Sequence, residues 1–145
     1  MTPTCRIGKT DAGIRVLLAE GPSDPDPDWL ERHRWVWNRT RMEEVLSQHN
    51  GPTFVCGIAL NIGQLRDLFT RIFLLRIDEA TQESRLLAHD QNNQPGRTEP
   101  QREQIRRGRS TFEAQILSMG AVTLDGTAAP SVIAEELVAL VAVDT

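Results

Sequence analysis

Residues 51–78, with the sequence GPTFVCGIALNIGQLRDLFTRIFLLRID, decide the fold. They contain two apolar runs, 53–61 and 71–78, which lack the alternation of a strand with one wet face and therefore predict buried strands. The intervening residues 62–69 place apolar side chains at helical spacing, so a short helix is expected between the strands. Strands joined by a helix run parallel, which predicts an α/β sheet flanked by helices.

Both predicted strands end in a polar residue, Asn61 and Asp78. The ligand crevice of an open α/β sheet lies beyond the carboxyl ends of its strands, so these residues mark the expected site. Outside this centre, apolar patterning predicts two further strands and four helices. The strands are expected at 14–19 and 120–126, and the helices at 29–49, 81–89, 99–119 and 131–142.

Composition favours one ordinary soluble domain over residues 1–145. The net charge of −4 gives no reason to expect nucleic acid or an anionic membrane as partner. No apolar run reaches the length of a membrane span and no leader precedes the first strand, so we expect a cytoplasmic protein. Cys5 and Cys56 are too far apart for a zinc-ligand spacing or a disulfide framework.

Arginine replaces lysine almost throughout, since Lys9 is the only lysine. Arginine suits phosphates and carboxylates, but a GC-rich genome produces the same bias. Tryptophans 29, 35 and 37 are interleaved with arginines on the helix expected at 29–49, which is one signal of nucleic-acid binding. Core packing also explains these rings, and neighbouring acids offset the arginines, so we expect no nucleic acid.

Gly8-Lys9-Thr10 is the second half of the phosphate-binding pattern G-x-x-x-x-G-K-[ST]. In such a loop the backbone N–H groups and the lysine bind phosphates, and the threonine binds Mg²⁺. Position 3, where the first glycine belongs, is proline, which removes a donor and forbids positive φ. The tripeptide therefore predicts nucleotide binding only if residues 3–10 are a shortened remnant of a phosphate-binding loop. A chance match is the alternative.

Asp24 and Asp26 alternate with prolines in the segment 23–28. Proline keeps this stretch extended and holds the carboxylates apart, which suits Mg²⁺ or a substrate hydroxyl. A solvated acidic turn that leads into the next helix is the alternative.

A lid-like segment is expected over about 85–109. It combines a polar loop with cations that reach phosphates only when a site closes. A solvated helix face paired with Glu99 and Glu103 would look similar. The cations in the loop and the first turns of the following helix are Arg97, Arg102, Arg106, Arg107 and Arg109.

Several short motifs occur together between Trp35 and Leu140. They are Trp35-Val36-Trp37-Asn38, Phe54-Val55-Cys56-Gly57 with Asn61, Phe69 before Phe73-Leu74-Leu75, Arg85 with Asn92 and Gly96-Arg97, and Gly120-Ala121 before Leu124-Asp125. In these motifs the chain resembles the small P-loop kinases of the adenylate and shikimate kinase type, in particular bacterial ATP-binding proteins described as AAA-family ATPase-like. The resemblance implies a parallel sheet that binds ATP and Mg²⁺ and transfers a phosphoryl group to a nucleoside, a nucleotide or a hydroxylated metabolite.

The resemblance also implies roles for individual residues. Asp24 and Asp26 would serve Mg²⁺ or the acceptor, and Gly57 and Asn61 would line the acceptor site. Gly8, Lys9 and Thr10 would meet the nucleotide if they are a remnant of the loop. Arg85, Arg97 and Arg106 would neutralise charge during transfer.

The chain departs from this family at its start. The first strand and an intact phosphate loop are missing, so the P-loop kinase-like domain is expected to be either incomplete at its N-terminus or degenerate. In addition, His89 and Thr70 stand where a second lid arginine and an acid are usual. Loss of a central strand exposes sheet edges, which predicts association, in the simplest case as a homodimer. A non-catalytic descendant that keeps the kinase fold as a binding or assembly module is therefore the alternative function.

Overall fold

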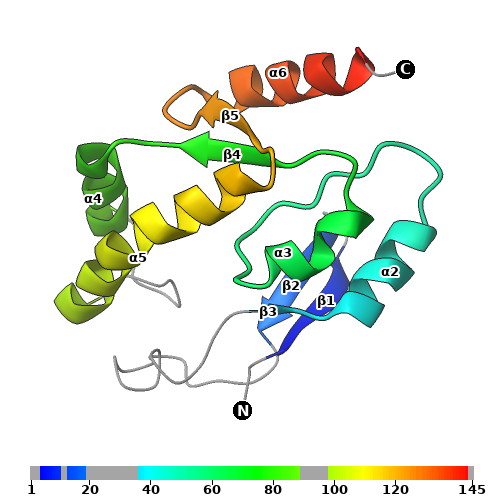
Figure 1. Ribbon diagram of the computed structural model, residues 1–145, viewed down its shortest axis with the longest axis horizontal. Helices are drawn as coiled ribbons and strands as arrows, with labels where there is room; N and C mark the ends of the chain where they lie inside the picture. Colours follow the sequence, from blue (N-terminus) through cyan, green and yellow to red (C-terminus); the bar gives the residue numbers. More distant parts are fainter. Residues whose placement is uncertain (1–3, 11–12, 19–35, 89–97, 144–145) are drawn as a thin grey trace. The chain divides into compact units, whose positions relative to one another are not determined.

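The computed structural model describes residues 4–10, 13–18, 36–88 and 98–143 (Figure 1). The chain divides into two compact units, 1–70 and 71–145. Whether these two units form one domain, as composition predicts, stays a prediction.

The first unit contains a small mixed sheet of three strands, in the order β2-β1-β3. Strand β1 (Thr4–Thr10) pairs antiparallel with β2 (Gly13–Leu18) and parallel with β3 (Val36–Trp37). Helix α2 (Arg39–Ser47) follows, and α3 (Ile62–Leu65) continues into the short 3-10 helix η1 (Arg66–Leu68). Asn38 begins α2, because its side chain accepts a hydrogen bond from the Arg41 N–H.

The core of the first unit forms where α2 meets the residues around α3. Met42 and Val45 lie three residues apart on α2, so both face inward, and Met42 is 0% exposed. They pack with Trp37, Ala59 and Leu65. This apolar cluster packs α2 against α3, and Arg39 of α2 also donates to the Gln64 carbonyl of α3 and to Asp67 of η1.

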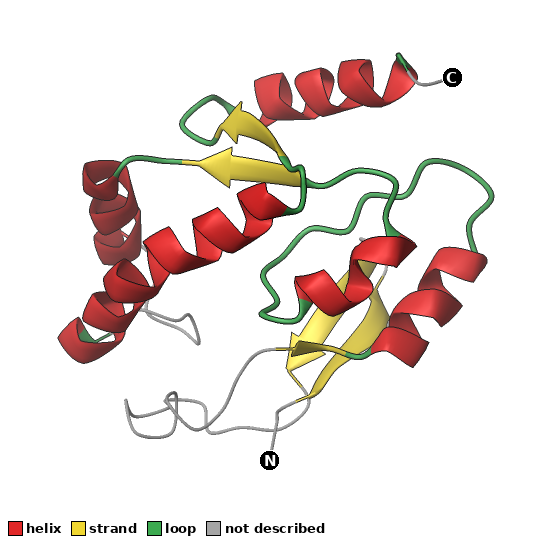
Figure 2. Cartoon of the chain, viewed as in Figure 1, coloured by secondary structure: helices red, strands yellow, loops and turns green. Residues whose placement is uncertain are grey.

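The second unit is built on two parallel strands, β4 (Phe73–Arg76) and β5 (Val122–Asp125), with Phe73 opposite Val122 and Arg76 opposite Asp125. Helices α4 (Glu79–Ala88) and α5 (Glu99–Ser118) lie between the strands in sequence, and α6 (Pro130–Ala142) follows β5. Helices α5 and α6 lie on opposite sides of the strand pair (Figure 2). The second unit is therefore a small layered α/β arrangement.

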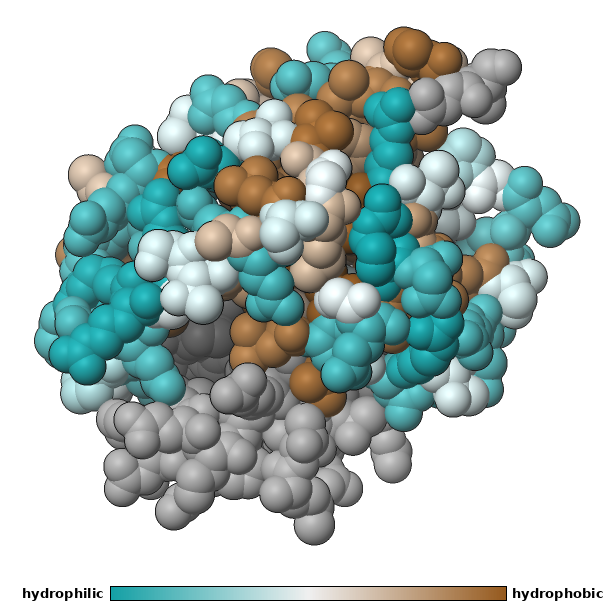
Figure 3. All heavy atoms as spheres, in the orientation of Figure 1, coloured by the Kyte–Doolittle hydropathy of each residue, from teal (hydrophilic) through white to brown (hydrophobic). Residues whose placement is uncertain are grey.

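Local sequence explains the helix boundaries of the second unit. Thr98 and Gln101 form a reciprocal capping box at the start of α5, with Pro100 among its first residues. Pro130 begins α6, where its missing N–H leaves no hydrogen bond unmade. The apolar side chains of α6 are not fully covered, since Val138 is 60% exposed, and apolar spheres reach the surface near α6 in Figure 3.

Helices α4, α5 and α6 lie close to the ranges expected at 81–89, 99–119 and 131–142, and one predicted strand does not exist. The expected strand at 53–61 is wrong, because residues 52–60 have no regular structure and Phe54 and Ile58 are exposed. Gly57 lies within this run and has φ 153°, a backbone angle that residues other than glycine rarely adopt. The parallel partner of β4 is β5 instead.

The structure is mixed α/β with a parallel pair of strands, in agreement with the coarser fold prediction. The helix expected at 29–49 starts only at Arg39, since Val36 and Trp37 are extended, and residues 29–35 lie outside the described part. Among the described residues, each helix is too short or too polar to cross a bilayer.

Candidate functional site

The candidate site lies at the carboxyl ends of β4 and β5. Asp125 is the last residue of β5, and Asp78 follows β4 by two residues, so the parallel strands bring both to one edge. The Gly126 N–H donates to the Arg76 carbonyl at 2.8 Å, which extends the ladder past β5. A Cβ at position 126 would lie 2.9 Å from Ile77 Cγ2, so only glycine allows this close approach.

Asp125 is an ionised hydrogen-bond acceptor at this edge. Its Oδ1 accepts from the Thr127 hydroxyl at 2.5 Å and from the Thr127 N–H at 2.9 Å. These two bonds hold the pKa of Asp125 below its usual value, the hydroxyl contributing most. The positive charge of Arg85 lowers that pKa further, whereas the negative charge of Asp78 opposes the shift.

Asp78 has a structural task as well. Its Oδ1 accepts from the Thr81 N–H at 2.6 Å, which satisfies a donor at the first turn of α4. This bond, and a weaker one from the Thr81 side chain, keep the pKa of Asp78 below its usual value. Both carboxylates are therefore charged at neutral pH.

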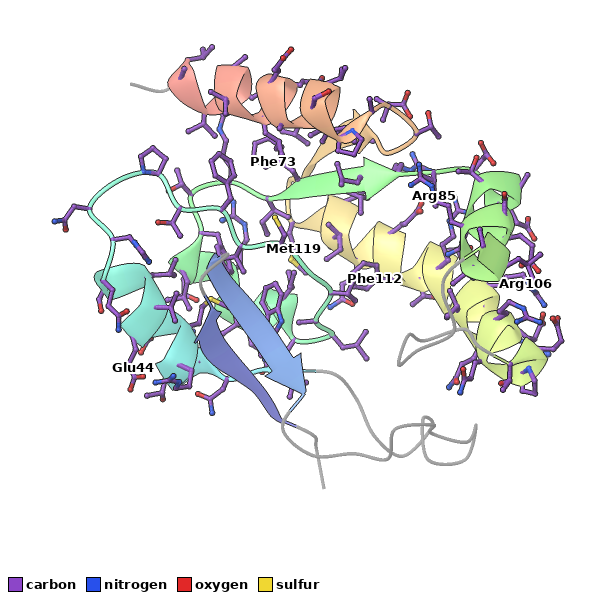
Figure 4. The ribbon with its side chains drawn as sticks, turned by 180° about the vertical axis from the view of Figure 1, so that it is seen from behind. Glu44, Phe73, Arg85, Arg106, Phe112 and Met119 are labelled. Carbon is purple, nitrogen blue, oxygen red and sulfur yellow. The ribbon has the colours of Figure 1, made fainter. Side chains whose placement is uncertain are left out.

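Arg85 is the cation of this edge. It lies in the last turn of α4, and its charge reaches Asp125. Figure 4 shows Arg85 beside the end of β4. Its side chain is exposed, and within the described residues it makes no hydrogen bond or ion pair.

The neighbouring arginines are engaged. Arg109 donates to the Ile77 carbonyl and to Glu113, and Arg76 donates to Glu113 at 3.2 Å. Arg109 therefore fixes the backbone between β4 and Asp78 instead of facing a ligand.

The predicted lid residue Arg106 is bound on three sides. Its guanidinium donates to Glu83 at 2.8 Å, to Glu99 at 2.7 Å and to Glu103 at 2.7 Å. An anionic ligand would have to displace carboxylates to reach it. Arg97 lies outside the described residues.

Gly8, Lys9 and Thr10 do not form a loop, which corrects the expectation of a shortened phosphate-binding turn. They end strand β1, where Gly8 pairs with Arg15, Lys9 with Ile14 and Thr10 with Gly13. A phosphate loop turns successive N–H groups toward one centre, whereas strand N–H groups point alternately to opposite sides. Asp24 and Asp26 lie outside the described residues.

Asn61 and Gly57 both contact Trp37 in the first unit. The Asn61 amide donates to the Trp37 carbonyl at 2.8 Å and accepts from the Trp37 N–H at 2.9 Å, as a neighbouring strand would. A Cβ at Gly57 would lie 3.1 Å from the Trp37 ring. In this structure both residues serve packing at β3, and their predicted role toward a phosphate acceptor stays a prediction.

Replacing Asn61 by Ala is expected to destabilise the protein by about 2 kcal/mol, because it leaves two part-buried backbone groups of Trp37 without partners. Urea unfolding followed by tryptophan fluorescence measures this loss. Asn50→Ala, at an exposed position of the same unit, is the control and should change stability little. Equal effects of the two substitutions would show that the Asn61 bonds contribute nothing.

Acid is expected to destabilise the protein, because hydrogen bonds or ion pairs lower the pKa of several carboxyls. These are Asp67, Asp78, Glu99, Glu103 and Asp125. A carboxyl whose pKa is lower in the folded state stabilises the fold above its unfolded pKa and loses that effect as pH falls through the folded pKa. The urea midpoint should therefore fall as pH drops below about 4.5. The fall should be shallower in Asp125→Asn, and a midpoint that stays level over this range would contradict the assignment.

Sequence reasoning marked Asp78 as a strand end and Arg85 as a site residue, but it missed Thr127 and gave Asp125 no site role. A signal was present, since an apolar run directly followed by Asp-Gly-Thr places a carboxylate and a hydroxyl at a strand end. Among the described residues, no group of three or more His, Cys, Asp or Glu side chains is arranged to hold a metal ion. No protein-family model, curated protein or solved structure matches the chain.

Proposed function

We propose that the protein is an ATP-binding kinase of the P-loop kinase type, which transfers a phosphoryl group to a small molecule. One observation carries the proposal: the carboxyl edge of the parallel strands presents Arg85, without a partner among the described residues, beside two ionised aspartates. A cation and carboxylates at this edge of an α/β layer form the setting in which phosphates and their counter-ion bind.

Arg85 would bind the phosphate oxygens and stabilise the charge that develops during transfer. A guanidinium suits this task, since it remains charged and offers several donors to planar or tetrahedral oxyanions. Arg85 is in place for this without breaking an ion pair of the described residues.

Asp78 and Asp125 would hold Mg²⁺ together with the phosphates. Magnesium in kinase sites is usually bound by one or two carboxylates plus substrate phosphates, so the pair is a sufficient donor set. Both carboxylates are kept ionised by hydrogen bonds from threonines, which agrees with a metal role. Bound Mg²⁺ would supply charge neutralisation between the phosphates and the aspartates.

The acceptor would be a nucleoside, a nucleotide or a hydroxylated metabolite. Its hydroxyl would donate a hydrogen bond to a carboxylate, and Asp24 and Asp26 remain the residues proposed for it. Because ATP would be the phosphoryl donor, we propose that the protein is cytoplasmic. We also propose that it associates into a homodimer, because a sheet of two strands exposes its edges.

One observation favours a second candidate, a non-catalytic module that keeps the kinase fold for binding or assembly. Gly8, Lys9 and Thr10 belong to strand β1, so the residues that would cradle phosphates by sequence are used for pairing. A descendant that no longer turns over ATP would retain the layered second unit without such a loop.

Thermal unfolding with and without Mg·ATP tests the proposal. A ligand present at about 100 times its Kd stabilises the folded state by about 2.7 kcal/mol, which raises the melting temperature by several degrees. The same preparation, given ATP labelled at the γ-phosphate and a panel of nucleosides, nucleotides and sugars, should label one acceptor class. Stabilisation together with labelling would support the kinase. If Mg·ATP causes no stabilisation and no acceptor is labelled, the kinase is overturned and the non-catalytic module is favoured.

A further inference from the structure

Helix α4 is attached to the second unit by charge more than by apolar packing. None of its residues is buried, and Leu87 is 58% exposed. The side-chain oxygens of Gln82 on α4 and Gln104 on α5 are buried and have no hydrogen-bond partner in the described part of the chain. Such an interface gains little from the hydrophobic effect and loses free energy through unpaired acceptors.

The ion pairs between the two helices converge on Glu83 of α4. Glu83 accepts from Arg106 at 2.8 Å and lies 4.0 Å from Arg102, both on α5. Arg102 and Arg106 are 15% and 22% exposed, so these pairs are less open to solvent than ordinary surface pairs. Hydrophilic side chains cover this end of the unit in Figure 3.

Other carboxylates orient the arginines from within α5. Arg106 donates to Glu99 and Glu103, and Arg102 donates to Glu99 at 2.8 Å. These bonds lie within one helix and would survive if α4 moved away. The contact with Glu83 is therefore the part of the network that joins the helices.

We propose that the Glu83 contacts with Arg106 and Arg102 form an electrostatic latch, which keeps α4 against α5 and opens when salt screens it. Because Asp78 accepts a hydrogen bond from the first turn of α4 and Arg85 lies in the last turn of α4, the latch also holds Arg85 beside Asp125. The latch itself needs no ligand, and only its consequence for Arg85 rests on the proposed function.

Amide hydrogen exchange of residues 79–88 tests the latch. Partly exposed ion pairs weaken as the Debye length shortens, so exchange of α4 should accelerate about three- to ten-fold on raising NaCl to about 1 M. Glu83→Gln should produce a similar acceleration at low salt, after which added salt should change little. The amides of β4 and β5 should keep their protection throughout.

Two substitutions are matched controls. Glu79→Gln removes the same charge from an exposed position of α4. Arg107→Gln removes a charge from α5, where the 79% exposed Arg107 side chain pairs with Glu103 of the same helix. Neither should accelerate α4. If Glu83→Gln and salt leave α4 unchanged, or if β4 and β5 accelerate to the same degree, the latch is disproved.

Discussion

Replacing Arg85 by Gln is expected to lower kcat for phosphoryl transfer by about 10²- to 10³-fold, because a cation that stabilises transition-state charge is lost. Arg85 carries the only guanidinium of the described strand edge without a hydrogen bond or ion pair there, so no neighbour replaces it. Initial rates with saturating ATP and the labelled acceptor measure the effect. Arg85→Lys should recover part of the rate, since it restores charge without the fork of donors.

Arg107→Gln is the matched control for this prediction. It also removes one arginine charge, but from an exposed position of α5 that pairs with Glu103 of the same helix in the described part of the chain. Its kcat should equal that of the unchanged protein, and both variants should unfold at nearly the same urea concentration. A rate loss that is equal in Arg85→Gln and Arg107→Gln would mean that overall charge, not the Arg85 position, governs activity.

Replacing Met42 by Ala is expected to destabilise the protein by about 2–5 kcal/mol, the largest stability effect of any single truncation proposed for this chain. Met42 is 0% exposed and lies in the cluster with Trp37, Val45 and Leu65, so truncation removes buried surface and leaves a cavity. Urea unfolding gives the change in free energy, provided that the denaturant dependence is unchanged.

Ile58→Ala tests whether burial is the cause of that loss. Ile58 belongs to the same unit and is 69% exposed, so its truncation should cost less than about 0.5 kcal/mol. Equal losses at both positions would contradict the placement of the core between α2 and α3.

The helices could be predicted from sequence because their signals are local. The apolar spacing over 99–119 and the cap residues at its start define α5, which spans Glu99–Ser118. The segment at 131–142 agrees with α6 in the same way. Periodicity and capping depend on residues within a few positions, so one sequence is sufficient.

Strand pairing was harder to predict than the helices, because it depends on residues that are distant in sequence. The run 53–61 has the composition of a buried strand, yet its backbone forms no strand, and β4 pairs with β5 instead. The loop expected at Gly8-Lys9-Thr10 is part of strand β1 for a related reason. A tripeptide does not reveal whether the backbone around it turns or extends.

The candidate site could be predicted only in part. Arg85 belongs to a motif of the P-loop kinase resemblance, and Asp78 follows an apolar run. Arg106 was recognised as a cation, but its three carboxylate partners depend on how α4 lies against α5. The two bonds between Asn61 and Trp37 likewise join residues that only the folded chain brings together.

Backbone amide chemical shifts recorded by NMR during a titration with Mg·ATP test the central claim most directly. If the carboxyl edge of β4 and β5 binds the phosphates, the largest changes should fall on Asp78, Thr81, Gly126 and Thr127, with the Arg85 side chain shifting in parallel. Arg85→Gln should reduce these changes at the same nucleotide concentration. Saturable shifts confined to residues away from this edge, or no shifts at all, would contradict the claim.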